Sequence, residues 1–271
     1  MGTGSRKSSQ QKHNRVIGTQ KQKAHKMKVR IPKLQNSRLA AAMLVLTTVA
    51  PIWAGQGNLG NAGVLPPQSH AFGKSSGEWT VAWWQWALSI PAANNPLLDT
   101  TGAFASVGQM GPVWFLAGTF GNSAERSLVI PAGKGIFMPV HPWIFGSCAG
   151  DCNPSNPGVQ CHVPTLRTAA ATAATSATTL EVSIDGVPVN EVGRYRALSP
   201  DSFSVTLPDA NVLQLFGLPT PAGEYAPQVS DGYWLMLKPL DVGNHTIRVH
   251  VVNSAFGVDS VVTSHITVTP N

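Results

Sequence analysis

Carboxylates are scarce in this chain: its 271 residues include 13 Asp and Glu, and 12% of all residues are charged. Glycoside hydrolysis needs two carboxylates that face one sugar bond. The acidic residues here fall into turns and caps, as Asp99 and Asp185 do close to Gly102 and Gly186. No carboxylate pair therefore indicates a glycosidase, and the sequence does not identify a reaction or a ligand.

The chain also lacks an apolar run that is long enough for a membrane helix, which needs roughly 20 residues. Residues 39–54 (LAAAMLVLTTVAPIWA) are too short, and the 38 residues before them hold eleven Lys or Arg and no Asp or Glu. A long basic region, a short apolar stretch and a small final residue predict a secretory signal peptide over 1–54, cleaved after Ala54. A true start at Met27 would give a signal of more ordinary length. We expect a secreted or periplasmic mature chain with no transmembrane span.

The positive charge of the chain belongs to this leader. The whole sequence has a formal net charge of +6, from 19 Lys and Arg against 13 Asp and Glu. Without the eleven basic residues of the leader, 8 basic residues remain (19 − 11), and the net charge becomes −5 (8 − 13). A weakly acidic chain lacks the basic surface that nucleic-acid binding requires. We therefore expect no nucleic-acid partner.

After the leader, residues 55–72 (GQGNLGNAGVLPPQSHAF) are rich in Gly, Asn and Pro and indicate an extended arm. Residues 73–271 are expected to form a single domain that begins with a helix over 76–89. Ser75 and Glu78 have capping-box spacing, and Pro91 ends the helix. Tryptophans recur along it at helical spacing, which predicts core packing for Trp79, Trp83 and Trp86. Trp84 lies off this stripe and is the better candidate for binding a ligand.

Short apolar runs with Gly- and Pro-rich breaks fill the rest of the chain, and they predict a mainly β fold. We expect an antiparallel β-sandwich, jelly-roll or immunoglobulin-like, with the Trp-rich helix and one further short helix over 166–179. The expected strands are 113–117, 128–130, 136–140, 180–184, 187–189, 194–198, 203–207, 233–237, 245–252 and 261–268.

All three cysteines, Cys148, Cys152 and Cys161, lie in residues 141–163, which are expected to be an irregular loop. In an exported protein this count predicts one disulfide and one remaining thiol, with three pairings open. The alternative is a zinc or copper site that adds His162, with His141 or Asp151 nearby. The spacing C-x3-C-x8-C-H lacks the usual C-x2-C pair, so we favour the disulfide and no cofactor.

A few further residues are candidates for ligand contact. His141 opens the cysteine loop beside Trp143, and the run Asp231-Gly232-Tyr233-Trp234 has the composition of a sugar site. The simpler interpretation of this run is a turn that enters a strand whose aromatic side chains pack inward.

Several ordered motifs resemble a family of exported bacterial proteins with no assigned activity: GEWTVAWWQWALSIP, NPLLDTTG, GPVWFLAG, IPAGKGIFMPV, IDGVPV and SDGYWLMLKPL. The resemblance covers about residues 73–268. It implies export and a β-sandwich core behind a Trp-rich helix, with a second helix near 166–179, and it supplies no catalytic residue. Family members tend to have cysteines near the positions of Ala105 and Ser127; this chain has neither, so that disulfide is absent here.

Three hypotheses of function follow. The one we favour is a non-catalytic, exported binding or envelope-associated β-sandwich, which contacts a carbohydrate or an envelope component through loop 141–163, Trp84, Trp143 and Trp234. The second is a metal-assisted extracytoplasmic hydrolase that uses His141 and His162. The third is a structural or adhesion protein of the extracellular matrix, for which the arm 55–72 is the cue. The sequence does not indicate an oligomeric state.

Overall fold

The computed structural model describes residue 61, residues 63–153 and residues 160–270. They belong to one compact unit, Gly55–Asn271. The predicted leader and the first part of the arm lie outside the described residues. The described part is mainly β with two α-helices, as the sequence predicts, and neither helix has the length and hydropathy to cross a membrane.

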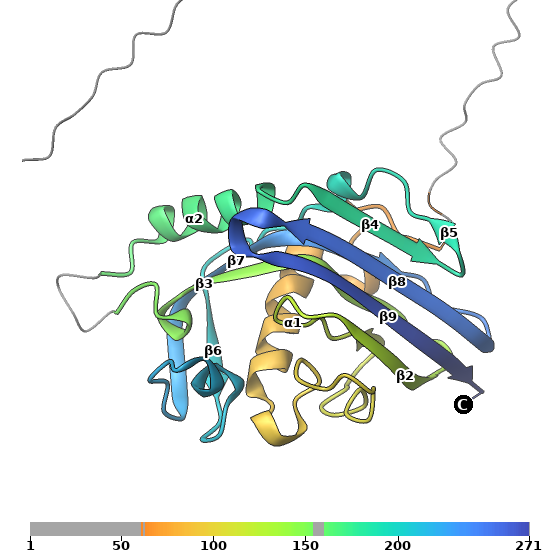
Figure 1. Ribbon diagram of the computed structural model, residues 1–271, viewed down its shortest axis with the longest axis horizontal. Coiled ribbons are helices and arrows are strands. Elements are labelled where there is room, and N and C mark those ends of the chain that lie inside the picture. Colours follow the sequence, from red (N-terminus) through yellow and green to blue (C-terminus); the bar gives the residue numbers. More distant parts are fainter. Residues whose placement is uncertain (1–60, 62, 154–159, 271) are drawn as a thin grey trace, which may run out of the picture. The chain divides into compact units, whose positions relative to one another are not determined.

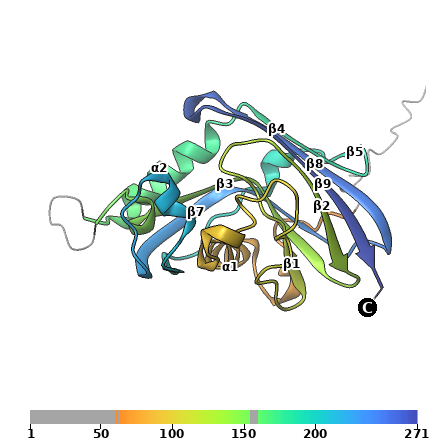
Figure 2. The ribbon, with the colours of Figure 1, turned by 60° about the horizontal axis from the view of Figure 1, so that its bottom comes forward.

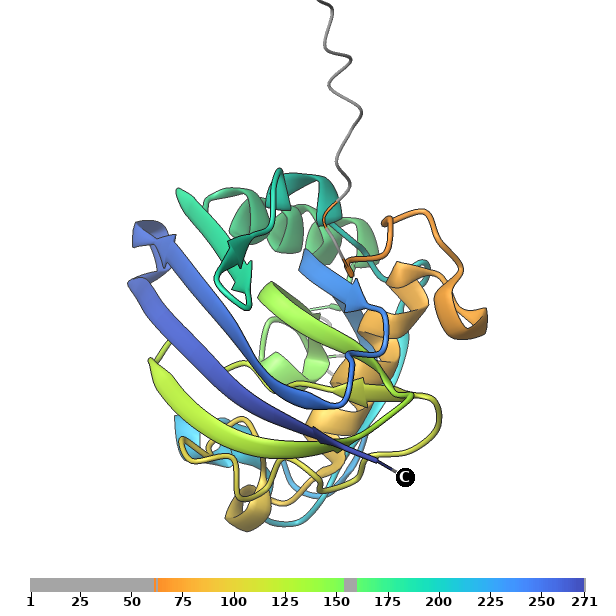
Figure 3. The same cartoon turned by 90° about the vertical axis from the view of Figure 1, so that its right-hand side faces the viewer.

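Nine strands form two sheets. Sheet A has the order β1-β3-β7-β6, with β1 at Val113–Phe115, β3 at Gly135–Gly146, β7 at Gly223–Leu237 and β6 at Phe203–Leu207. Sheet B has the order β2-β9-β8-β4-β5, with β2 at Ala124–Pro131, β9 at Val258–Thr269, β8 at Gly243–Asn253, β4 at Thr179–Ile184 and β5 at Val187–Pro188. Sheet B is curved into a half-barrel (Figure 3).

Both sheets are mixed, which corrects the expectation of a purely antiparallel arrangement. Strand β1 pairs in parallel with β3, and β2 pairs in parallel with β9. The reason is the path of the chain, which leaves sheet A after β1, forms β2 in sheet B and then returns to sheet A as β3. Two reversals of direction between β1 and β3 leave these neighbours parallel.

Strands β3 and β7 form the centre of the unit, and both of their faces are covered. Ile136, Met138 and Leu235 point to the core shared with sheet B, whereas Phe137 and Trp234 point to the core under the first helix. The two rings of Phe137 and Trp234 stack, with 5.3 Å between their centroids. Burial on both faces explains why these strands are apolar without alternation.

The first helix, α1, spans Ser76–Ser89, the range that the sequence predicts. Its capping box is formed: the Glu78 backbone N–H donates to Ser75 Oγ over 3.2 Å, and the Ser75 N–H donates to the Glu78 carboxylate over 2.7 Å. The helix packs on the face of sheet A that points away from sheet B (Figures 1 and 2). The predicted core tryptophans are buried there.

Each of the four helix tryptophans also uses its indole N–H. Trp83 donates to the carbonyl of Leu116 over 2.8 Å, and Trp84 donates to Ser230 Oγ over 3.0 Å. Trp79 and Trp86 donate to the carbonyls of Ala71 and Val107. A buried Trp N–H usually finds such a partner, although those of Trp114 and Trp234 have none among the described residues. The helix is therefore hydrogen-bonded to four segments that are distant from one another in sequence.

The second helix, α2, spans Val163–Thr175 and begins three residues earlier than predicted, because Pro164 suits the first helical turn. Its buried side chains, Leu166 and Ala170 among them, pack against Val229 and Phe145 beyond the end of the shared core. Sheet B and α2 thus cover successive parts of the same face of sheet A.

Three local predictions were wrong. Asp231 and Gly232 lie inside β7 and form no turn. Residues 141–146 continue β3 and are not an irregular loop. Residues 194–198 form no strand: a 3-10 helix, Val192–Tyr195, precedes a single bridge from Arg196 to Tyr233. The residue before this helix, Glu191, has a φ of 53°, a left-handed conformation that interrupts an extended chain. The other 3-10 helices are Ala71–Gly73, Ala92–Asn94, Ser147–Ala149, Val212–Phe216 and Ser254–Phe256.

Replacing Trp83 tests how strongly the fold depends on α1. Trp83→Ala removes a side chain that is 1% exposed and should lower the free energy of unfolding by about 4 kcal/mol. Trp83→Phe retains much of the apolar contact but leaves the Leu116 carbonyl unpaired, which should cost about 1–2 kcal/mol. Denaturant unfolding measures both. The exposed Gln85→Ala on the same helix is the control, at about 0.5 kcal/mol; equal losses for Trp83→Ala and Gln85→Ala would contradict this role.

Candidate functional site

Beyond residue 137, the outer edge of β3 has no paired strand in the part of the chain that the structure describes. Strand β1 pairs only with residues 135–137, and the Leu116 N–H then donates to the carbonyl of Phe137. The alternation of the strand directs Pro139 to this same edge. Pro142 follows the bulge at residue 140 and pairs with Gly232 of β7. The Gly232 carbonyl accepts a hydrogen bond from the Ala197 N–H, on the side of β7 away from β3. The backbone nitrogen of Pro142 therefore faces the open edge as well. Prolines therefore remove the N–H donors that would be unpaired here.

A cavity of about 440 Å³ lies beside this edge, within the size range of small-molecule sites. It is bounded by α1, by the concave face of sheet B, by the 3-10 helix before Gly217 and by the segment 116–121, which connects sheet A to sheet B. The residues that shape it include Trp84, Leu116, Val140, His141, Trp143, Leu213, Phe216, Ile247, Val249, Phe256, Ser260, Val262 and Ser264.

The lining of the cavity is mainly apolar and carries no formal charge. It contains no Lys, Arg, Asp or Glu, and His141 is its one ionisable residue among those described. The polar side chains that it offers, besides His141, are the hydroxyls of Thr119, Ser260 and Ser264. The Thr119 hydroxyl already donates to the carbonyl of Asn122.

His141 is held neutral at the wall of the cavity. Its Nε2 accepts hydrogen bonds from Trp143 Nε1 over 2.8 Å and from Asn253 Nδ2 over 3.0 Å, so Nε2 carries no proton. Burial lowers the pKa of the imidazole, and a hydrogen bond to the backbone of Ala173 only partly opposes this shift. Through its contacts with Asn253 and the backbone of Ala173, His141 joins the ends of β8 and α2 to β3.

A buried arginine fixes the segment that closes the cavity. Arg126 on β2 is 4% exposed and donates from Nη1 to the carbonyl of Ala117 over 2.6 Å and from Nη2 to that of Gly118 over 3.0 Å. Its Nε donates to the carbonyl of Asp99 over 2.7 Å. Burial lowers the pKa of Arg126, and the nearby carboxylate of Asp99 opposes this. The guanidinium thus lies behind the wall, with its N–H groups directed to backbone oxygens.

Aromatic side chains surround the cavity where it meets solvent. Phe120 packs on Phe216 at 4.6 Å between ring centroids, and Trp143 packs on Phe256 at 4.4 Å. Phe216 and Phe256 are 54% and 46% exposed. These two pairs come from four separate segments of the chain, and they place large apolar side chains at the opening.

The structure brings together three of the residues that the sequence suggested for ligand contact: Trp84, His141 and Trp143 all line the cavity. Trp234 is buried in the core under α1, and Tyr233 packs at the margin of the core between the sheets. Asp231 is buried in an ion pair, in which Arg196 Nε and Nη2 donate to its two carboxylate oxygens over 2.8 and 2.6 Å. This pair raises the pKa of Arg196.

Sequence reasoning missed the contributions of sheet B and of the aromatic rim. Ser260, Ser264, Phe216 and Phe256 drew no attention because a strand pattern does not reveal which of its faces borders a void. The sequence did contain one signal. Inward and outward positions alternate along β9, and two of the inward positions are serines where apolar residues are expected.

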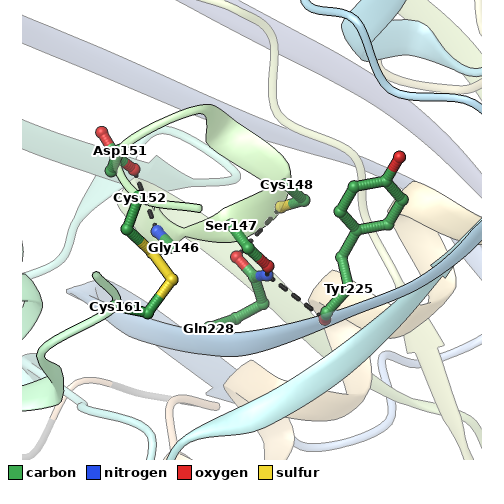
Figure 4. Close-up of a disulfide and its surroundings, with 8 residues drawn as sticks. All are labelled: Gly146, Ser147, Cys148, Asp151, Cys152, Cys161, Tyr225 and Gln228. Atoms are coloured by element: carbon green, nitrogen blue, oxygen red, sulfur yellow. Dashed lines mark hydrogen bonds between the residues drawn. A yellow bond between two sulfur atoms is a disulfide. The ribbon is translucent and has the colours of Figure 1, made fainter. Parts of the chain in front are cut away.

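The cysteine loop is a separate structure (Figure 4). Cys152 and Cys161 form a disulfide, which confirms the prediction of one disulfide and one free thiol. The free Cys148 is buried, with its thiol 3.0 Å from Gln228 Oε1. Because Cys152 and Cys161 are joined in the disulfide, they cannot supply thiolate ligands to the alternative metal site. Across the described residues, no three His, Cys, Asp or Glu side chains form a group that could hold a metal.

His162 lies at the N-cap of α2, exposed, with its Nδ1 3.0 Å from Thr165 Oγ1. No hydrogen bond joins it to His141 within the described residues. Asp151, which the sequence suggested as a further metal ligand, accepts a hydrogen bond from the Gly146 N–H over 2.9 Å. Burial raises the pKa of Asp151, while this hydrogen bond opposes the shift.

Cys148 should be unreactive in the folded protein. Burial raises the pKa of its thiol to about 12, and the charge of Asp151 adds to this, so the thiolate that reacts with thiol reagents is nearly absent at neutral pH. We expect no release of thionitrobenzoate from Ellman's reagent in buffer and release for one thiol per chain in denaturant. Rapid labelling of the native protein at a rate unaffected by pH would contradict the burial of Cys148.

The neutral His141 should make stability depend on pH. Its pKa is lowered from 6.5 in the folded state. Between that folded value and 6.5 the unfolded chain binds more protons, so stability falls as the pH drops, by at most about 1.4 kcal/mol per pH unit. Burial lowers the pKa of His245, but its contacts with Asp185 and the Asp241 carbonyl raise it overall. Its stabilisation has the opposite sign: it is present below 6.5 and lost as the pH rises through the folded value.

Urea unfolding at a series of pH values separates the two histidines. His245→Gln should remove the gain in stability on acidification between its raised folded pKa and 6.5, and should leave the loss below pH 6.5 unchanged. His141→Gln should make it shallower. A curve for His141→Gln that parallels the unmodified protein would show that His141 is not the buried neutral group.

No protein-family model matches the chain, and no curated protein matches its sequence. Among solved structures, the chain is similar to one titled "Structure of PbICP-C in complex with falcipain-2", with a TM-score of 0.23 and 10% identity, over 59% of this chain and 100% of that chain. A likeness of this size supports no argument about fold or function. The cavity is therefore interpreted from its own geometry.

Proposed function

We propose that this chain is an exported, non-catalytic binding protein whose cavity holds a small, uncharged and mainly apolar molecule. The observation that carries the proposal is the cavity of about 440 Å³ between the helix α1 and the concave face of sheet B. An apolar cavity of this size with few polar groups is the usual form of a small-molecule site.

The neutrality of the lining favours a neutral ligand. A charged group that entered the cavity would lose its hydration and find no opposite charge there, which costs far more than a hydrogen bond returns. His141 gives no help, because its pKa is lowered and its Nε2 already accepts two hydrogen bonds. Arg126 directs its guanidinium to backbone carbonyls. The ligand is therefore uncharged, or keeps any charge outside the opening.

The same lining disfavours a carbohydrate, the partner that the tryptophans first suggested. A sugar carries many hydroxyls, each of which needs a hydrogen-bond partner when it leaves water. A flat sugar-binding platform would need exposed tryptophans, whereas Trp84 and Trp234 are buried. An apolar ligand is consistent with both observations, and the aromatic rim gives it an apolar path of entry.

Two further parts of the proposal concern the chain as a whole. The two sheets with an apolar core between them support a β-sandwich, of which jelly-roll and immunoglobulin-like arrangements are particular forms. Export is supported by the basic and apolar leader sequence and by the disulfide Cys152–Cys161, because disulfides persist in oxidising compartments.

The test is binding of a neutral apolar fluorophore, N-phenylnaphthylamine, to the purified protein. We expect saturable binding with a Kd on the order of 100 μM, because about 0.3 kcal/mol per non-hydrogen atom gives about 5 kcal/mol for a probe of this size. Val262→Trp should weaken it at least tenfold, because Val262 lines the cavity and the larger indole fills it.

Val261→Trp is the matched control. Val261 precedes Val262 on β9 and points to the opposite face of sheet B, so the same substitution there leaves the cavity unchanged. Thermal melting of both variants checks that they fold. Absence of saturable binding, or an equal loss in Val261→Trp and Val262→Trp, would refute a ligand in this cavity.

A further inference from the structure

The inner face of β9 carries two hydroxyls inside the apolar cavity. The inward residues of this strand are Ser260, Val262, Ser264, Ile266 and Val268, and the first three line the cavity. Strand β9 is the dark blue strand in the curved sheet of Figure 3. Ser260 and Ser264 are 8% and 6% exposed, so both hydroxyls are withdrawn from bulk solvent.

These two serines differ from the other buried Ser, Thr, Asn, Gln, His and charged residues that the structure describes; the buried indole N–H groups of Trp114 and Trp234 also have no partner there. Twelve more polar or charged residues are buried to the same degree, and each makes at least one side-chain hydrogen bond: Thr80, Asn95, Asp99, Arg126, His141, Ser199, Asn211, Thr220, Gln228, Ser230, Asp231 and Asn253. Ser260 and Ser264 have no side-chain partner among the described residues. A hydroxyl that is turned away from bulk solvent is stabilised by a hydrogen-bond partner, so a partner from inside the cavity is expected.

Ordered water is a poor candidate for that partner. A buried water typically needs two to four polar neighbours. The side chains of the cavity provide few beyond the two serines: the Thr119 hydroxyl already has an acceptor, and His141 Nε2 already accepts two hydrogen bonds. A ligand that carries its own polar group needs only one partner at each serine.

The spacing of the serines restricts the shape of that ligand. They are four residues apart on one strand, which separates them by about 13 Å at about 3.3 Å per residue. Val262 lies between them on the same face. A ligand that reaches both hydroxyls is therefore elongated, with an apolar middle over Val262 and a polar group towards each end.

We propose that the ligand is a neutral, elongated apolar molecule with a hydroxyl or carbonyl group near each end, and that Ser260 and Ser264 bind these two groups. This inference rests on the proposed function, because it concerns the same cavity. A serine hydroxyl both donates and accepts, so either group is accommodated at either end. The two serines then determine specificity, and the apolar lining provides the affinity.

Two neutral probes with the same apolar body test this proposal: biphenyl, and the biphenyldiol with a hydroxyl at each para end. Displacement of N-phenylnaphthylamine measures both. Ser260→Ala and Ser264→Ala should each weaken biphenyldiol binding about three- to tenfold, the value of one neutral hydrogen bond. Neither should change biphenyl binding by more than about twofold. The affinity of each probe for a variant is compared with its affinity for the unmodified protein, so the different solubilities of the two probes cancel.

Controls keep the result specific. Ser127→Ala removes a hydroxyl from the exposed side of β2 in the same sheet and should change neither probe. Ser260→Thr and Ser264→Thr keep the hydroxyl and should retain biphenyldiol binding. Because the native hydroxyls are unpaired, the alanine variants should melt at or above the temperature of the unmodified protein.

The outcomes distinguish the two proposals. If neither probe binds, the apolar cavity is not a ligand site, and both proposals fail. If both probes bind but the alanine variants weaken them equally or not at all, the proposed function stands and the role of the serines is refuted. Selective loss of biphenyldiol in both alanine variants, with recovery in the threonine variants, supports recognition of a ligand with two polar ends.

Discussion

The arrangement of the described chain depends on one set of contacts: the four indole N–H groups of α1, each of which meets an oxygen on a different segment. Trp83 reaches the start of the connection between the sheets at Leu116, and Trp84 reaches the centre of sheet A at Ser230. Apolar burial drives the helix onto the sheet, but burial has no direction. The hydrogen bonds supply direction, and they determine which segments surround the helix.

The connection 116–121 shows what this direction achieves. The carbonyl of its first residue, Leu116, accepts a hydrogen bond from Trp83. The carbonyls of the next two residues, Ala117 and Gly118, accept hydrogen bonds from Arg126. Both anchors are side chains with fixed, planar donors, so the segment has little freedom to collapse inward. A void between two layers persists only when its walls are held apart, since protein interiors otherwise pack closely. The cavity is thus a consequence of anchoring as much as of apolar composition.

Much of the architecture could be predicted from local sequence signals. The helix α1 was predictable to the residue because the capping box at Ser75 and the proline at 91 define its ends. The disulfide followed from cysteine count and compartment, although its pairing did not. The mixed sheets could not be predicted, because parallel pairing depends on which sheet each strand joins. The cavity was equally hidden: Trp84 and Trp143 were suspected for their aromatic character, whereas Ser260 and Ser264 matter only because of what lies opposite them.

The two prolines at the open edge of β3 affect the class of molecule that the cavity accepts. An extended peptide that binds a sheet does so by adding a strand, and it needs the N–H donors of the edge as well as its carbonyls. Pro139 and Pro142 take away those donors where the edge borders the cavity. A polypeptide would therefore have to leave its own carbonyls unpaired on entry, while a compact organic molecule has no backbone to satisfy. For the binding function proposed above, the two prolines make the addition of a peptide strand less favourable at this edge.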